Sequence, residues 1–354
     1  MKKTSKIMSL VLAGAMVLSM TACAGNTAET TSAAAKTQET AADTASKAEE
    51  TNGAEVSESE TAAKAEGTTY KIGVLQLVQH TALDAANDGF IAALDDAGIA
   101  YEVDQQNASG DQSACQTVAS KFANEKKDLI LAIATPAAQA MVGAVEDTPV
   151  LITAVTDPAE SGLVDTNEKP GANVTGTSDL TPVKEQIDLL KQLVPEAKTV
   201  GVLYCSAESN SKIQADMAKE AIAAAGMESK EYTVSSSNEI QTVVQSMVGA
   251  VDAVYAPTDN VIAAGMATVG MVAGDNNLPV ICGEAGMVQN GGLATYGIDY
   301  YQLGYMTGQQ AVKILTEGAS PADMPIEYLP AEKCELTVNE ETAQTLGIDV
   351  SGLK

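Results

Sequence analysis

Two stretches of the chain begin almost identically: IGVLQLVQHT at residues 72–81 and VGVLYCSAES at residues 200–209. The likeness continues, because DLILAIATPAAQAM from Asp128 is similar to DAVYAPTDNVIAAGM from Asp252, and TPVLITAV from Thr148 is similar to LPVICGEA from Leu278. One such match is typical of any buried strand, but three in one order and at similar spacing indicate a duplicated unit. The sequence therefore predicts two lobes of one architecture.

From residue 70 onward, short apolar runs alternate with longer amphipathic ones, the pattern of parallel strands joined by crossover helices. We expect an α/β fold of two doubly wound lobes, with a ligand cleft between them, because ligands of open α/β sheets bind beyond the carboxyl ends of the strands. The predicted strands lie at residues 71–77, 100–104, 129–134, 150–153, 199–204, 228–234, 253–256, 280–282 and 293–296.

The charge of the chain restricts its partners. The formal net charge is −27, and all 20 basic residues are lysine. Such a surface repels polyanions, so nucleic acid is not expected as a partner. Arginine is the side chain that best binds a carboxylate through two hydrogen bonds, and without it an anionic ligand group must be held by backbone N–H groups, hydroxyls, amides or lysine.

The first residues, MKKTSKIMSLVLAGAMVLSMTACAG, contain an apolar run at 7–22 that is shorter than the about 20 residues of a membrane-spanning helix. We interpret residues 1–22 as a secretory signal. Its end, LSMTAC, resembles the bacterial lipobox, in which Cys23 would be lipidated; a plain cleaved signal with an incidental cysteine is the alternative. Residues 23–68 have the composition of a disordered tether, so we expect an extracytoplasmic protein anchored to the cell membrane.

Polar residues directly follow most of the predicted strands, and together with Tyr255 they form the candidate ligand-binding set. Each one could also be a simple helix cap, so the argument depends on the whole set. Free N–H groups at helix starts could hold a ligand carboxylate. The candidates are Gln79, His80, Thr135, Thr156, Asp157 and Ser178 in the first part of the chain, and Ser206, Glu208, Ser209, Asn210, Tyr255, Thr258, Asp259, Glu284 and Asp299 in the second.

A ligand ammonium needs a desolvated carboxylate or several acceptors. Among the acidic candidates, Asp259 and Asp299 are preferred for this role over Asp157 and Glu284. An aromatic or apolar ligand group could stack on tyrosines near the strand ends, which could equally be core residues. These tyrosines are Tyr204, Tyr255, Tyr296 and Tyr300.

Enzyme chemistry and metal binding lack sequence support. His80 is the only histidine, which rules out a multi-histidine metal site and leaves a Ser-His-Asp triad possible only through that residue. No GxSxG motif, P-loop or GxGxxG motif accompanies it. We therefore expect no catalytic residue, no metal and no cofactor.

The cysteines beyond Cys23 are expected to be free thiols. If the second lobe has the strand order 2-1-3-4, Cys205 and Cys282 lie two strand spacings apart, roughly 10 Å. That exceeds the Cα separation of about 7 Å that a disulfide can bridge. Cys115 and Cys334 are predicted to be free as well.

Over nearly all of residues 70–350 the chain resembles the substrate-binding lipoproteins of ABC importers with a type I periplasmic-binding fold, specifically the tryptophan/tyrosine group. The stretches that carry the resemblance are IGVLQLVQHTALDAANDGF, ATPAAQA, TDPAESGLV, NVTGTSD, GVLYCSAESNS, PTDN and GIDYYQLGYMTGQQAVKIL. In that fold the chain crosses between the lobes three times. The resemblance implies crossings near 178–181, 282–284 and 315–321, an N-terminal lobe of 69–180 plus 283–317, and a C-terminal lobe of 181–282 plus 318–354.

The resemblance implies a solute-binding protein that captures an amino acid, expected to be an aromatic one, by hinge closure and delivers it to the ABC permease. We expect it to act as a monomer. A sugar or nucleoside is the alternative ligand. An extracellular hydrolase lacks a recognisable nucleophile with its base. A transcription regulator of this fold would need a basic helix-turn-helix where this chain has the expected signal and an acidic tether.

Overall fold

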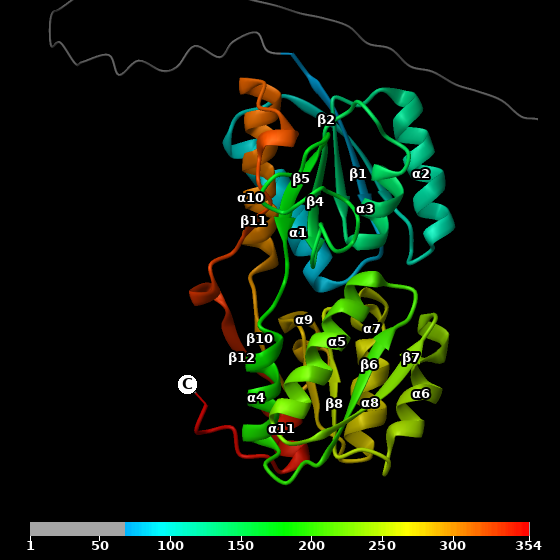
Figure 1. Ribbon diagram of the computed structural model, residues 1–354, viewed down its shortest axis with the longest axis vertical. Coiled ribbons are helices and arrows are strands. Elements are labelled where there is room, and N and C mark those ends of the chain that lie inside the picture. The colour runs from blue at the N-terminus through cyan, green and yellow to red at the C-terminus, as the bar shows by residue number, and fades with distance from the viewer. Residues whose placement is uncertain (1–67, 354) are drawn as a thin grey trace, which may run out of the picture. The chain divides into compact units, whose positions relative to one another are not determined.

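The computed structural model describes residues 68–353, which form two α/β lobes, each built on a six-stranded sheet (Figure 1). The predicted α/β fold of two doubly wound lobes is confirmed. The signal, Cys23 and most of the tether lie outside the described residues. The first sheet has the order β11-β5-β4-β3-β1-β2, with β1 (Tyr70–Gln76), β2 (Tyr101–Asn107), β3 (Leu129–Ile133), β4 (Val150–Val155), β5 (Val174–Ser178) and β11 (Glu327–Tyr328).

The second sheet repeats this arrangement strand for strand, in the order β12-β10-β9-β8-β6-β7. The strands that join each sheet last differ between the lobes: β11 runs parallel to β5, like the rest of its sheet, whereas β12 runs antiparallel to β10. The strands of the second sheet are β6 (Thr199–Cys205), β7 (Glu228–Val234), β8 (Ala253–Ala256), β9 (Val280–Cys282), β10 (Ala294–Gly297) and β12 (Glu335–Val338).

Helices cover the faces of both sheets (Figure 1). In the first lobe these are α1 (Thr81–Asp96), α2 (Gln112–Glu125), α3 (Thr135–Val142) and α10 (Tyr300–Val312), the last of which packs along α1. The second lobe contains α4 (Val183–Leu193), α5 (Ser209–Ala224), α6 (Ile240–Met247), α7 (Asn260–Ala264), α8 (Met266–Asp275), α9 (Ala285–Gln289) and α11 (Glu340–Leu346). Strands β3 and β4 are buried along their whole length, as expected for parallel strands covered on both faces.

Matching glycines of the two repeats allow the same close packing of a helix on a strand in each lobe. A Cβ atom on Gly73 of β1 would lie 2.8 Å from the ring of Phe122 in α2, and one on Gly201 of β6 would lie closer still to Met247 of α6. Both glycines therefore let a covering helix approach the central strand.

The repeated aspartates also correspond. Asp128 accepts the Lys71 N–H group at 2.7 Å, and Asp252 accepts the Thr199 N–H group at 2.8 Å. Each carboxylate thus ties the start of one strand to the start of its neighbour. The duplication read in the sequence is a duplication of packing and of hydrogen bonding.

The chain crosses between the lobes three times, and two of the crossings differ from the expected positions. The first lies between β5 and α4, at residues 179–182. The second was expected at 282–284, but β10 pairs with β9 and β12 in the second sheet, so the chain crosses at residues 298–299. The third was expected at 315–321, but β11 pairs with β5 in the first sheet, so the crossing follows at residues 329–334.

The four cysteines of the described chain, Cys115, Cys205, Cys282 and Cys334, are free thiols. Strand β8 separates β6, which ends at Cys205, from β9, which ends at Cys282. The 2-1-3-4 order on which the prediction depended is therefore present. In residues 68–353 no helix is both long enough and apolar enough to cross a membrane.

Candidate ligand-binding site

A small cavity lies between the lobes, where the carboxyl ends of the two sheets face each other. Its volume is about 10 Å³, room for about one water molecule. An amino acid could therefore enter only if the lobes moved apart. The residues that line it come from both lobes and from the first crossing: His80, Leu83, Ala154, Asp179 and Tyr300 on one side, and Asn210, Thr258, Asp259, Asn260, Ala263 and Glu284 on the other.

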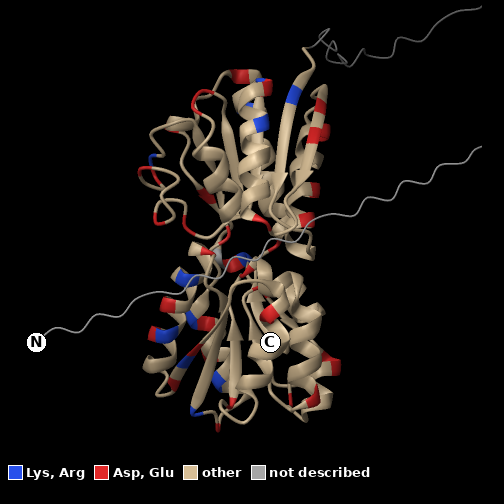
Figure 2. Cartoon of the chain, turned by 90° about the vertical axis from the view of Figure 1, so that its right-hand side faces the viewer, with Lys and Arg blue, Asp and Glu red and all other residues tan. Residues whose placement is uncertain are grey.

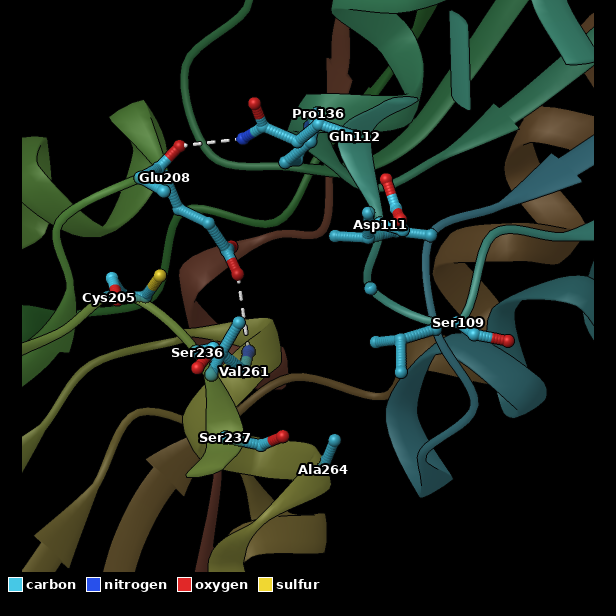
Figure 3. Close-up of a pocket in the computed structure, with 15 residues that line it drawn as sticks. Ser109, Asp111, Gln112, Pro136, Cys205, Glu208, Ser236, Ser237, Val261 and Ala264 are labelled. Atoms are coloured by element: carbon cyan, nitrogen blue, oxygen red, sulfur yellow. Dashed lines mark hydrogen bonds between the residues drawn. The ribbon is translucent and has the colours of Figure 1, made fainter. Parts of the chain in front are cut away.

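A larger hollow of about 410 Å³ adjoins this cavity between the lobes (Figure 3). The two spaces meet at Asn260, which lines the cavity and donates at 2.6 Å to Glu208, which lines the hollow. The hollow is walled by Leu77, Val78, Ser109, Gly110, Asp111, Gln112 and Pro136 of the first lobe and by Cys205, Ala207, Glu208, Ser235, Ser236, Ser237, Val261 and Ala264 of the second.

Asp179 presents an unpartnered oxygen in the cavity. It follows β5 directly, its side chain is only 4% exposed, and its Oδ2 atom accepts the hydroxyl of Tyr300 at 2.7 Å. Its Oδ1 atom has no hydrogen-bond partner. Burial raises the pKa of this carboxyl to about 6, against the opposing effect of its hydrogen bond to Tyr300.

Glu284 is the second buried acid of the cavity. It caps helix α9 by accepting the N–H groups of Gly286 at 2.5 Å and Met287 at 2.7 Å. Burial raises its pKa to about 7, and the nearby charge of Asp179 raises it further, although the two N–H bonds oppose this. A cation in the cavity would favour the ionised form of both acids.

Asp259 also lines the cavity, but its oxygens are occupied. Its Oδ1 atom accepts the N–H group of Ile262 at 2.8 Å, and its Oδ2 atom accepts that of Cys205 at 2.5 Å. Glu208 accepts the N–H group of Val261 at 3.2 Å in the same turn. Burial raises the pKa of both acids, that of Glu208 to about 8. These two carboxyls hold the start of α7 in place.

His80 connects the lobes at the edge of the cavity. Its Nε2 atom lies 3.2 Å from Oδ1 of Asn260, and its Nδ1 atom is buried without a partner. Burial lowers the pKa of the imidazole, which is therefore neutral at pH 7. His80 precedes helix α1 but does not cap it with its side chain, so the first N–H groups of the helix, at residues 81–83, are its free donors.

Several hydrogen bonds join the lobes around the cavity. The buried Gln214 of α5 donates through Nε2 to Thr156 of the first lobe at 3.0 Å and to Thr258 of its own lobe at 2.5 Å. Gln139 of α3 donates to the Ser209 hydroxyl at 3.2 Å. At the rim of the hollow, Gln112 donates to the carbonyl of Ala207 at 3.0 Å. The lobes are thus held against each other by polar contacts that opening would break.

Figure 2 shows the acidic residues over both lobes and at the faces where the lobes meet. No lysine lines the cavity within residues 68–353. The negative charges of the cavity acids are therefore stabilised by hydrogen bonds and not by a lysine.

The structure gathers only part of the predicted site. The predicted residues that line the cavity are His80, Asn210, Thr258, Asp259 and Glu284. Four more lie around it. The Ser178 hydroxyl donates to the carbonyl of Thr156 beside the first crossing. Glu208 accepts a hydrogen bond from Asn260 within the second lobe, and Ser209 accepts one from Gln139 of the first lobe.

The remaining predicted residues lie outside the cavity, each for a structural reason. Asp299 is exposed and caps α10, and Asp157 accepts hydrogen bonds from the Glu160 N–H group and the Asn167 amide. Tyr255 is a core residue whose hydroxyl donates to Gln186 at 2.7 Å. Thr135 is buried at the start of α3, and Gln79 and Ser206 are exposed. Of the four tyrosines considered for stacking, only Tyr300 lines the cavity.

Asp179 is the acid that the sequence analysis missed. It follows β5, whose sequence VTGTS was not predicted as a strand, so the residue after its end was not considered. Ala154 was missed too; it lines the cavity near the end of β4 with a φ of 55°, a value rare for a residue other than glycine. Such strain is frequent at binding sites.

Two solved structures resemble this fold, and comparing them indicates how the two lobes are arranged. A Streptococcus pneumonia ABC domain in complex with L-Trp is 39% identical, with a TM-score of 0.78 over 80% of this chain and 97% of that one. A ligand-free, open substrate-binding protein with adhesive properties from Clostridium difficile is 46% identical, but its TM-score is only 0.62 over 81% of this chain and 97% of that one. Together with the hydrogen bonds between the lobes, this difference indicates a closed arrangement.

The sequence comparisons agree with the structural ones. A tyrosine-binding protein of Clostridioides difficile (strain R20291) is 41% identical over 352 residues, which cover 98% of this chain and 93% of the relative. The model of the family described as ABC transporter substrate binding protein matches residues 71–352. The chain belongs to this family of extracytoplasmic solute-binding proteins, which are not enzymes.

Proposed function

We propose that this protein binds an aromatic amino acid between its lobes and delivers it to an ABC permease. The observation that carries the proposal is the kind of group left unpartnered in the cavity. These groups are Oδ1 of Asp179, Oδ1 of Asn210 and Nδ1 of His80. The two side-chain oxygens accept hydrogen bonds, and a primary ammonium offers three donors. Its positive charge would also compensate the negative charges of Asp179 and Glu284, which have no cationic partner in the cavity lining.

The ligand carboxylate is assigned to the start of helix α1. The chain has no arginine, and no lysine lines the cavity in the described part of the chain. The N–H groups at residues 81–83 begin this helix directly after His80, Leu83 lines the cavity, and the positive end of the helix dipole favours an anion there.

The aromatic side chain is assigned to the apolar part of the lining. Leu83, Ala154 and Ala263 offer apolar surface, and the ring of Tyr300 offers a face or an edge for stacking. Two relatives support an aromatic ligand: one is named a tyrosine-binding protein, and the other was solved in complex with L-Trp. The remaining predicted residues around the cavity, Thr156, Ser178, Glu208 and Ser209, would position these groups without touching the ligand.

Capture would proceed by closure of the lobes. A ligand that touches both lobes binds the closed form more tightly than the open form and shifts the population toward it. The bonds of Gln214 and His80 across the interface would form in the same step. The permease would then distinguish the loaded protein by the closed pair of lobes.

The protein would reach the permease as a monomer on a lipid anchor. The expected lipobox at Cys23 and the acidic tether support this, since a flexible segment lets a tethered domain reach its membrane partner. Changing Cys23 to Ala should abolish labelling with radioactive palmitate and release the protein from the membrane fraction. Retention of the label would contradict the assignment of the lipidated residue.

The ligand is tested by calorimetric titration and by thermal shift of the purified protein against a panel of amino acids, pentoses and nucleosides. A ligand that binds only the native form raises the melting temperature by mass action. We expect tyrosine, tryptophan or phenylalanine to raise it, and pentoses and nucleosides to leave it unchanged. A shift produced only by pentoses or nucleosides would refute the proposed ligand class.

A further inference from the structure

We infer that this cavity recognises the ammonium of its ligand far more strongly than the carboxylate, so that it also binds aromatic amines without a carboxylate, of the tyramine and tryptamine class. The inference rests on the proposed function, because it assumes that the ligand lies in the same cavity. It adds a class of ligand whose members carry a net positive charge.

The first argument comes from the unpartnered atoms of the cavity. Asp179 is 4% exposed and Asn210 is 3% exposed, and each has one oxygen without a partner. His80 adds an unpartnered ring nitrogen. The Nε2 atom of this neutral imidazole donates to the Asn260 oxygen, so its Nδ1 atom is also an acceptor, and all three unpartnered side-chain atoms of the cavity accept hydrogen bonds. A ligand that offers donors therefore satisfies buried groups whose present state is costly.

The second argument comes from charge. Asp179, Asp259 and Glu284 line the cavity, and Glu208 lies directly behind Asn260. Neither a lysine nor a charged imidazole offsets them in the described lining. A zwitterionic amino acid brings no net charge into this acidic environment, whereas a monoamine brings one positive charge. The ligand carboxylate meets only the amides at the start of α1, so its removal should cost little.

The test is a calorimetric titration at pH 7.5 with three ligands of one scaffold: tyrosine, tyramine, and 3-(4-hydroxyphenyl)propionate, which keeps the carboxylate and lacks the amine. We expect the Kd of tyramine to lie within about tenfold of that of tyrosine, and the Kd of the propionate to be about 100-fold weaker or more. Tyramine binding about 100-fold weaker than tyrosine would overturn the inference and leave the proposed function intact. Failure of all three to bind, together with failure of tryptophan and phenylalanine in the thermal-shift panel, would refute both.

A pair of variants sharpens the result. Asp179→Asn keeps the shape of the side chain and removes its charge, and should weaken tyramine about 10- to 100-fold. The matched control is Asp299→Asn, the same change at an exposed acid outside the cavity, where asparagine still caps the helix. The control should leave both affinities unchanged. An Asp179→Asn protein that melts normally and binds tyramine as tightly as the unchanged protein would overturn the inference.

Discussion

The two lobes share one strand order but differ in how they finish their helix starts at the interface. In the first lobe, neither α1 nor α3 has a side chain capping its first turn, although Asp111 caps α2 and Asp299 caps α10. In the second lobe, α7 and α9 are capped by the carboxylates of Asp259 and Glu284. The first-lobe side of the cavity therefore offers free amide donors together with one acid, Asp179, and the second-lobe side offers Asp259 and Glu284.

This difference shows that the duplicated core supplies the scaffold while the turns supply the function. The opposed walls suit a molecule with an anionic and a cationic end. Because the acids outnumber the side-chain cations of the lining, the cationic end should dominate recognition. The following changes test the contrast between the walls and between the lobes.

The largest effect is expected from removing the charge on the acidic wall. Glu284→Gln should weaken amino acid binding by about 100-fold, because an ammonium loses a charged acceptor. The same change should lower the melting temperature of the ligand-free protein only slightly, since it removes one of the two hydrogen bonds that cap α9 but also removes a buried charge that no cation offsets. Titration calorimetry and thermal melting measure the two effects. Unchanged affinity would remove Glu284 from the site.

The next effect tests the repeat itself. Gly73→Ala would press a methyl group into the ring of Phe122, whereas Gly201→Ala would press it into the terminal methyl of Met247. An aromatic ring packed on a strand cannot bend away, but a methionine can adopt another rotamer. We expect Gly73→Ala to reduce the free energy of unfolding by about 2 kcal/mol, and Gly201→Ala by less than about 1 kcal/mol. Equal losses in denaturant unfolding would contradict this asymmetry between the lobes.

Much of this scaffold is predictable from sequence because its signals are local. Buried parallel strands give apolar runs, and the repeated glycines and aspartates mark the same positions in each lobe. The second crossing was not predictable in this way. Strand β10 stays in the second sheet through its pairing with β12, about 40 residues later in the chain, and nothing in the sequence of β10 reveals that partner.

The site was predictable to the extent that strand ends define it. His80, Asn210, Thr258, Asp259 and Glu284 follow recognisable strands. Asp179 was not predicted, because the threonines and glycine of β5 do not form the apolar run by which a buried strand is recognised. Asp299 lies at the second crossing and caps α10 of the first lobe, where it is exposed, and its place outside the cavity depends on that crossing. These errors concern tertiary placement and not local conformation.

A smaller effect is expected at the contact between the walls. Gln214→Leu removes the bond to Thr156 in the first lobe and those to Thr258 in the second, at similar side-chain volume. The closed form should lose stability, so that ligand affinity falls about tenfold. Solution scattering should show a larger radius of gyration without ligand. Gln139→Leu, which breaks an exposed contact with Ser209, should have little effect, and an equal loss in both variants would argue against a special role for the buried glutamine.

The smallest effect concerns the pH dependence of the ligand-free protein. The folded-state pKa values of Asp179, Glu284 and Glu208, about 6, 7 and 8, are raised above the unfolded values. The stability that each contributes is fully present below its unfolded pKa and is lost as the pH rises through its folded pKa. The melting temperature should therefore fall by several degrees between pH 5 and pH 8.5.

The acids whose pKa is lowered by partners, such as Asp252 and Glu231, lose their contribution mainly at pH values below this window. A saturating amino acid should reduce the fall, because its ammonium favours the ionised form of Asp179 and Glu284. Asp179→Asn should reduce it as well, because the variant lacks one of the titrating groups. A melting temperature that rises with pH across the window would show that the acidic wall already carries its charge without a ligand, and the contrast between the two walls would then lose its basis.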